Sequence, residues 1–295
     1  MTRQEQDGQE QDGVTAKQIV DTLFGPDEAV FDREGRGVSI DELYPAFSAD
    51  PDGQEILPLS GTTFGEPVVV EEPNLSFLTP YLDELRLFEK RWGFVKGGET
   101  REEWCLRMRE EVAPVLNELT KICSEEEIMH PQGVYTYVSC AAEGETLFLF
   151  PNGETEAPRA LNFPRLANGA CLCDRFKTLS GGGRDALGLI AVNLGTKVYE
   201  TVRLWTEQGQ AEDAKLLDGY AVEMAYALTG YVASMMGAQG VCVGNLHPLG
   251  VSKEGNAKDQ SVLIKLVQAR SIGISFSGNY RMTPEYAALA LLLPR

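Results

Sequence analysis

The chain has 295 residues, of which 43% are hydrophobic and 24% charged, so it is neither disordered throughout nor fibrous. Lys and Arg number 26 against 44 Asp and Glu, which gives a formal net charge of −18. A nucleic-acid backbone would be repelled by this charge, and no basic stripe in the sequence offsets it. We therefore expect no nucleic acid among the partners.

The apolar segments and the cysteines indicate the compartment. Residues 1–13 are polar and acidic and lack the apolar core of a secretory signal. The longest nearly uninterrupted apolar run, 287–293, is far shorter than the roughly 20 residues that cross a bilayer. The six cysteines include no Cys-x-x-Cys pair, which fits a reducing environment. We expect a cytoplasmic protein without membrane contact.

The chain divides into three predicted parts. Residues 1–13 have almost no apolar side chains to bury, which predicts a disordered acidic tail. Residues 14–63 form an N-terminal extension, in which a capping-box spacing predicts a short helix ending near Gly25. Residues 64–295 are expected to form one domain.

Two helices are predicted at the start of this domain. Proline near the first helical position predicts a helix from Thr79 to about Trp92, with Asp83 in its first turn. Thr100 and Glu103 have the spacing of a capping box, which predicts a longer helix after them. Pro114 should kink that helix.

β-Branched and aromatic runs predict the strands. Residues 133–140 and 146–150 read as a hairpin with a five-residue loop. Three further strands are expected, at residues 188–194, 240–244 and 272–276.

The longest helix is predicted at about 211–236, with Glu223 at the border of its apolar stripe. Helices alternate irregularly with paired strands, and no strict βαβ rhythm is present. This order favours an α+β fold over a doubly wound parallel sheet.

Generic motifs of catalysis and metal binding are lacking in the sequence. His130 and His247 do not have zinc-site spacing. Cys171 and Cys173 would share one face of a strand and read as buried free cysteines. Residues 181–183 are three glycines that read as a turn, because no helix follows them to face a phosphate. We predict no catalytic and no metal-binding residue.

A set of stretches occurs in an informative order: Phe64–Val70, Leu78–Phe88, Pro131–Cys140, Leu161–Arg165, Cys171–Phe176, Leu187–Gly195, Leu216–Asp218 and Ile272–Pro284. Together they resemble the activation domain of cobalamin-dependent methionine synthase, the module that binds S-adenosylmethionine. The resemblance runs from about residue 64 to the C-terminus. It implies a twisted, mostly antiparallel sheet with long flanking helices.

The resemblance also implies acidic ligand positions. Asp83 matches an aspartate expected near the ligand's amino group, and the alternative reading is a first-turn carboxylate that favours the helix dipole. The family's helix glutamate aligns with Val222, so the neighbouring Glu223 becomes the candidate. The alternative for Glu223 is a solvated residue at the helix edge.

The family's ligand loop, Arg-x-x-x-Gly-Tyr-Pro, aligns with residues 246–252. Leu246 replaces the arginine that fixes the ligand carboxylate, and Val251 replaces the tyrosine. His247 reads as a loop residue or, when protonated, as a partial substitute for the arginine. The cofactor-binding positions carried over from this loop are Leu246, Pro248, Gly250 and Val251.

For function, the resemblance implies an accessory protein of cobalamin-dependent methyl transfer. It would support reductive reactivation of a corrinoid protein, with S-adenosylmethionine as methyl donor and cobalamin carried by the partner. The expected partners are a corrinoid-binding protein or methyltransferase subunit and a flavodoxin-like or other reductant. Two alternatives stay open: a non-enzymatic cap or assembly module that has lost S-adenosylmethionine, and a pocket for another small molecule. Alignment of the reactants and exclusion of water could supply much of the acceleration, so whether the chain is itself an enzyme stays open.

Overall fold

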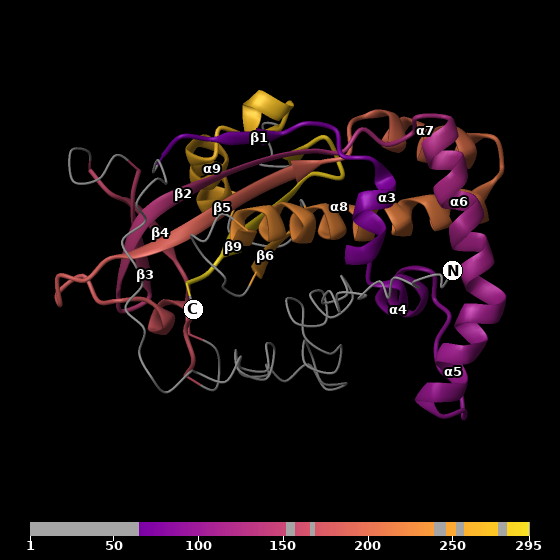
Figure 1. Cartoon of the computed structure of the whole chain (residues 1–295), viewed down its shortest axis with the longest axis horizontal. Coiled ribbons are helices and arrows are strands. Elements are labelled where there is room, and N and C mark those ends of the chain that lie inside the picture. Colours follow the sequence, from indigo (N-terminus) through magenta and orange to yellow (C-terminus); the bar gives the residue numbers. More distant parts are fainter. Residues whose placement is uncertain are drawn as a thin grey trace, which may run out of the picture.

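The computed structural model describes residues 65–151, 157–165, 169–238, 246–251, 257–276 and 282–294 (Figure 1). The predicted tail, the short helix of the extension and the strand at 240–244 lie outside these residues. The elements, in chain order, are β1 (Val68–Val70), α3 (Leu75–Leu78), η1 (Thr79–Tyr81), α4 (Glu84–Arg86), η2 (Leu87–Arg91), α5 (Arg101–Arg107), η3 (Met108–Val112), α6 (Ala113–Glu125), β2 (Gln132–Glu143), β3 (Thr146–Phe150), β4 (Arg159–Asn162), η4 (Leu172–Arg175), β5 (Asp185–Asn193), α7 (Lys197–Glu207), α8 (Ala211–Ala238), β6 (Leu246–Val251), α9 (Ala257–Leu266), η5 (Ala269–Ile272), β7 (Ser275–Phe276), β8 (Met282–Thr283) and β9 (Ala288–Leu292).

Most of the described strands form one antiparallel sheet. Its order is β4, β3, β2, β5, β9, β6, and β1 pairs with β2 beyond the end of β3. Each of these strand pairs is antiparallel. The strands β7 and β8 form a small sheet of their own. The structure confirms the predicted α+β class with a mostly antiparallel sheet.

The sheet has a core on each face. Tyr135, Ile190 and Leu292 pack toward α8, whereas Val134, Leu189 and Leu291 pack toward α9 and η5. Alternate residues of a strand point to opposite faces, so these two sets follow from the register. All nine residues of β5 are buried, as expected for a central strand that is covered on both sides.

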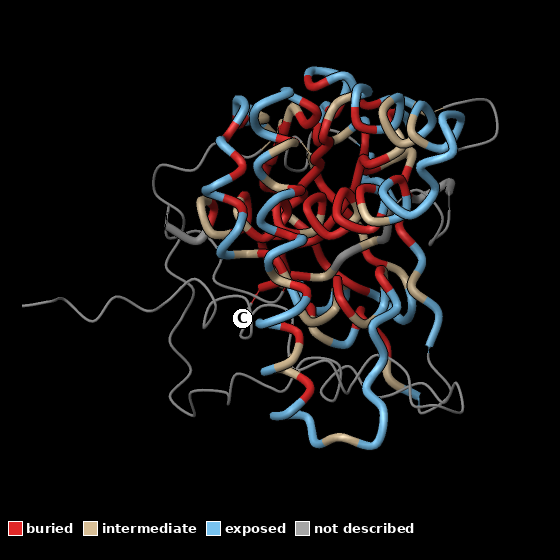
Figure 2. The backbone as a smooth tube through the Cα atoms, turned by 90° about the vertical axis from the view of Figure 1, so that its right-hand side faces the viewer, coloured by how far each residue is buried: buried red, intermediate tan, exposed pale blue. Residues whose placement is uncertain are grey.

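Helix α8 runs along one face of the sheet as its main covering element (Figure 1). Its 28 residues correspond to a length of about 42 Å. Close packing depends on glycines in the sheet, because a Cβ at Gly133 would lie 2.8 Å from Val232 and one at Gly188 would lie 2.7 Å from Met236. The second side of α8 is covered by further helical segments, so the buried residues gather in the middle of the molecule (Figure 2).

The prediction of one continuous helix over residues 79–92 is wrong, because the segment is divided into shorter helical turns. Pro80 does begin a helical turn, but that turn is the short 3₁₀ helix η1. Leu82 is extended, with ψ at 123°, and Asp83 starts a new helix as its N-cap. The segment then ends in the π-helical turn η2. Local capping by Asp83 therefore divides what the apolar spacing indicated as one helix.

The capping box at Thr100 and Glu103 is confirmed, since each side chain accepts a hydrogen bond from the other residue's backbone N–H. The helix after it is interrupted by the π-helical turn η3, directly before the first turn of α6, where Pro114 lies. Proline has no N–H to donate, and a wider turn accommodates its ring. The predicted interruption therefore occurs, but as a π turn ahead of the proline.

Two strand predictions need correction. The hairpin loop has two residues, Gly144 and Glu145, because Ala141 and Ala142 continue β2 and pair with β3. Gly144 has φ at +60°, which makes so tight a turn accessible. The strand at 272–276 is reduced to β7, since Ile272 ends the 3₁₀ helix η5. The strand at 188–194 is confirmed as β5, and α7 was not predicted.

In the described part of the chain, no helix combines the length and apolarity needed to cross a bilayer.

Candidate functional site

The segment from η1 to η2 lies antiparallel to α8 and is anchored to it by hydrogen bonds at both ends. At one end, the hydroxyls of Tyr81 and Ser234 are 2.8 Å apart. At the other end, Trp92 Nε1 donates a hydrogen bond of 2.9 Å to the carbonyl oxygen of Leu216. These two anchors hold the segment across the face of α8 that points away from the sheet.

Between the anchors, Glu223 of α8 receives two arginines. Arg86 donates to Glu223 Oε2 from Nε at 2.7 Å and from Nη2 at 2.6 Å. Arg91 donates to Oε1 from Nε at 2.8 Å. The Glu223 side chain has no exposed surface, whereas 24% of the Arg86 side chain and 35% of the Arg91 side chain are exposed. Glu223 is thus a buried carboxylate held on both oxygens, and the reading as a solvated helix-edge residue is wrong.

The π-helical turn explains why both arginines reach one carboxylate. Residues five apart on an α-helix lie about 140° apart around the axis. In η2 the N–H of Trp92 bonds to the carbonyl oxygen of Leu87, five residues earlier, at 2.9 Å. This wider turn brings the side chains of Arg86 and Arg91 to the same side.

Gly219 lets the π turn approach α8. A Cβ there would lie 2.8 Å from Arg91 Cβ and 3.1 Å from Trp92 Cδ1. Both neighbouring atoms are close to the backbone of η2 or part of a rigid ring, so they could give way only if the segment moved. The absent side chain at Gly219 therefore sets the distance between the two elements.

Asp83 adds a second carboxylate to this group. Its Oδ1 accepts a hydrogen bond of 2.9 Å from the backbone N–H of Arg86 and so caps α4. Burial by itself would lower the pKa of Arg86, but Glu223 and then Asp83 raise it above its usual value. The Arg86 guanidinium also lies 4.8 Å from the ring centre of Tyr226, in a cation–π contact. We call Asp83, Arg86, Arg91 and Glu223 the arginine–carboxylate cluster.

The predicted loop positions lie in strand β6. Leu246 is fully buried, pairs with Leu292 and faces α8. His247 is the next residue of the strand and pairs with Leu291, whose side chain belongs to the opposite core. His247 therefore points away from α8 and cannot take the place of an arginine at position 246. In addition, burial and then Arg175 lower the pKa of His247 to about 4, so its imidazole is neutral near pH 7.

The remaining loop positions are placed by their backbones. Pro248 pairs with Ala290 and Val251 with Ala288, with an irregularity in register between them at which Gly250 lies. Their side chains lie outside the described residues. The strand assignment corrects the expectation of a loop for this stretch.

The predicted ligand positions fall into two separate groups. Leu246 lies beside Leu292, and Leu292 and Met236 both lie against Gly188. Met236 is 13 residues after Glu223 on α8, a distance of about 20 Å along the helix. The structure brings Asp83 and Glu223 together through Arg86, and it places β6 far along the helix from them. Arg86 and Arg91 were not predicted as site residues. Two residues five positions apart face the same side only in a π turn, and the sequence did not reveal that turn.

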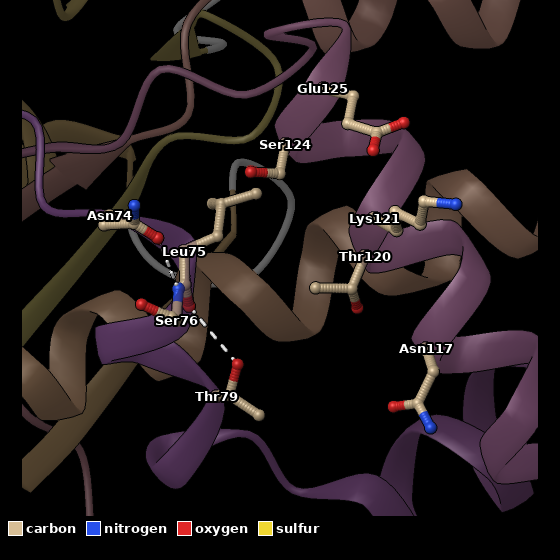
Figure 3. A pocket seen from close by; sticks show the side chains of 9 residues that line it. All are labelled: Asn74, Leu75, Ser76, Thr79, Asn117, Thr120, Lys121, Ser124 and Glu125. Carbon is tan, nitrogen blue, oxygen red and sulfur yellow. Dashed lines mark hydrogen bonds between the residues drawn. The ribbon is translucent and has the colours of Figure 1, made fainter.

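A pocket of about 350 Å³ lies between α3 and α6 (Figure 3). Its lining consists of Asn74, Leu75, Ser76, Thr79, Asn117, Thr120, Lys121, Ser124 and Glu125. The Thr120 hydroxyl is 3.0 Å from that of Tyr220 of α8, which ties α6 to the long helix. Leu75 is the apolar side chain of this lining, and the other eight side chains carry polar groups.

The cysteine pair lies in a 3₁₀ helix rather than on a strand. Cys171 caps η4 through its sulfur, which accepts a hydrogen bond of 3.3 Å from the Cys173 backbone N–H. Burial, and then Cys171, raise the pKa of Cys173 to about 12, so its thiol stays protonated. Among the described residues, no three His, Cys, Asp or Glu side chains are placed to share a metal ion.

Comparison with known proteins supports the fold. No protein-family profile matches the chain, and no curated protein does. A solved structure, the crystal structure of the MetH reactivation domain bound to AdoHcy, is similar, with a TM-score of 0.60 and 16% sequence identity. The match covers 77% of this chain and 78% of that one. The chain shares the fold of that reactivation domain.

Proposed function

We propose that the protein is an accessory protein of cobalamin-dependent methyl transfer, which supports reductive reactivation of a corrinoid protein with S-adenosylmethionine as methyl donor. The observation that carries this proposal is the fold, which is similar over 77% of the chain to a reactivation domain bound to AdoHcy. In this chemistry a reduced corrinoid cobalt takes the methyl group from the sulfonium, and S-adenosylhomocysteine is left. The protein itself would bind, orient and shield the donor.

The arginine–carboxylate cluster has a charge pattern that fits the amino-acid end of this donor. Arg86 and Arg91 offer cations and Asp83 offers an anion on partly exposed side chains. Strand β6 fits less well, because Leu246 supplies no charge and is packed in the core. Support for donor binding therefore comes from the arginine–carboxylate cluster, on the face of α8 that the segment from η1 to η2 covers.

The test is a reactivation assay with the full chain, a corrinoid protein of the same cell in the cob(II)alamin state, and a chemical or flavodoxin reductant. We expect methylcobalamin, measured by its absorption spectrum, to form faster when both this protein and S-adenosylmethionine are present. Calorimetric titration with S-adenosylmethionine gives the binding step separately. No heat at millimolar ligand would contradict the donor role.

A second candidate is a non-enzymatic cap or assembly module for a corrinoid protein. The observation in its favour is that Leu246, which the sequence resemblance aligns with the family's ligand arginine, has a fully buried apolar side chain. A carboxylate that loses such a partner forgoes roughly 1.5–3 kcal/mol. Binding of the purified corrinoid protein without S-adenosylmethionine binding would support the cap. Failure of both binding measurements would leave the third alternative, a site for another small molecule.

A further inference from the structure

We propose that the arginine–carboxylate cluster binds the amino-acid end of the ligand, with Arg91 and Arg86 on the carboxylate and Asp83 on the ammonium group. This inference rests on the proposed function and deepens it, because it moves recognition of the ligand carboxylate from β6 to the segment that covers α8, beside the Asp83 that the resemblance relates to the ammonium group. The ligand class is a nucleoside that carries a free α-amino acid, such as S-adenosylhomocysteine.

The donors that remain open in the cluster carry the argument. Arg86 uses Nε and Nη2 on Glu223, and Arg91 uses only Nε. Arg86 Nη1 and both terminal nitrogens of Arg91 thus have no acceptor among the described residues. With 35% of its side chain exposed, Arg91 can present these terminal nitrogens to a carboxylate in a two-pronged contact.

The charges favour a zwitterion over a simple anion. Two guanidinium groups and two carboxylates give the cluster a net charge of zero. Glu223 is buried between the arginines, whereas Asp83 is partly exposed and uses Oδ1 for the helix cap. Asp83 Oδ2 has no partner among the described residues and can accept from an ammonium group. A ligand with one carboxylate and one ammonium group would pair with both open charges.

The cluster is also held in place before any ligand arrives. Glu223 fixes both guanidinium groups, the π turn sets their side, and Gly219 sets their distance from α8. Groups that are already ordered lose little conformational entropy on binding. The buried glutamate therefore acts as the positioning residue of this site.

Calorimetric titration of the full chain tests the inference with two probes, S-adenosylhomocysteine and 5′-methylthioadenosine, which lacks the amino-acid end. We expect Arg91→Gln to weaken S-adenosylhomocysteine roughly tenfold or more, the equivalent of about 1.4 kcal/mol, and to leave 5′-methylthioadenosine unchanged. Asp83→Asn retains an N-cap acceptor and should weaken only the first probe. Arg109→Gln, a change of an exposed arginine outside the cluster, is the matched control and should affect neither.

The outcomes separate the two proposals. If the wild-type protein binds S-adenosylhomocysteine and Arg91→Gln binds it equally well, this inference is overturned and the proposed function stands. If the wild-type protein does not bind the probe, both fail. Arg91→Gln should fold, because Arg86 still pairs with Glu223; Arg91→Lys, which keeps the charge and loses the fork, should lie between the two affinities. A melting temperature measured for each variant identifies any loss that comes from unfolding.

Discussion

The Glu223 carboxylate has no exposed side-chain surface, so its stability in the folded protein depends on the arginines that contact it. Burial of an unpaired charge costs several kcal/mol, and paired charges in good geometry offset that cost. The same holds for Arg86, which is largely covered by α8 and Tyr226. One substitution in this group should therefore affect the whole segment.

We predict that Glu223→Gln lowers the free energy of unfolding by about 3–5 kcal/mol, because two guanidinium groups then lose their common anion. Urea denaturation followed by circular dichroism measures this change. Glu207→Gln is the control, since Glu207 forms an exposed ion pair with Arg203 and its loss should leave the free energy of unfolding nearly unchanged. Similar effects of the two substitutions would contradict a structural role for the buried pair.

His247 should make the protein less stable in acid. Its pKa is about 4 in the folded chain and 6.5 as the ordinary value, so the unfolded chain takes up the proton first as the pH falls. This destabilising effect of His247 is absent above pH 6.5 and grows as the pH falls toward 4. Between pH 7 and pH 4, the free energy of unfolding should fall in both proteins. The fall should be about 1–3 kcal/mol smaller in His247→Gln than in the wild type. Parallel pH profiles of the two proteins would contradict this prediction.

At the scale of elements, π turns determine which side chains face the same side of a helical segment. η2 places Arg86 and Arg91 on one side, and η3 ends one helix where Pro114 begins the next. Neither turn has a signature in the apolar spacing, because π turns are rare and short. Each is held by packing against the rest of the domain.

Gly219→Ala tests the contact between η2 and α8. The added methyl group would lie 2.8 Å from Arg91 Cβ, so the segment must move away from α8. We expect the protein to lose about 1–3 kcal/mol of stability despite the higher helix propensity of alanine. Gly98→Ala, where a Cβ would meet nothing within 4 Å, should leave the melting temperature nearly unchanged. Equal melting temperatures of both variants would contradict the close approach.

At the scale of the molecule, stability is concentrated in the sheet and α8. All nine residues of β5 are buried, whereas α5 buries only Trp104 and α7 only Val198. Figure 2 shows the same gradient, with exposed segments around a buried centre. Helices with so few buried contacts open at lower free energy than central strands.

Hydrogen exchange measured by mass spectrometry should therefore be slowest in β2, β5 and the middle of α8, and faster in α5 and α7. The expected difference in protection is at least tenfold. Exchange in α7 as slow as in β5 would show that another surface covers it in solution.

The sequence by itself determined much of the fold. Local signals identified the capping box at Thr100, the strand around Ile190 and the long helix at 211–236, because capping, alternation and helical spacing depend on neighbours in the chain. The resemblance of several stretches, in the same order, to the activation domain predicted the antiparallel architecture. Asp83 was identified as a candidate in this way, and its binding role stays a prediction.

Only the tertiary structure decided the partners of Glu223. Its two arginines are more than 130 positions away in the sequence, and the π turn and Gly219 that align them act through packing. The separation of β6 from this cluster likewise depends on where along α8 each element lies. Side chains brought together across a helix surface leave no periodic trace in the sequence, because their spacing is set by contacts between elements rather than within them.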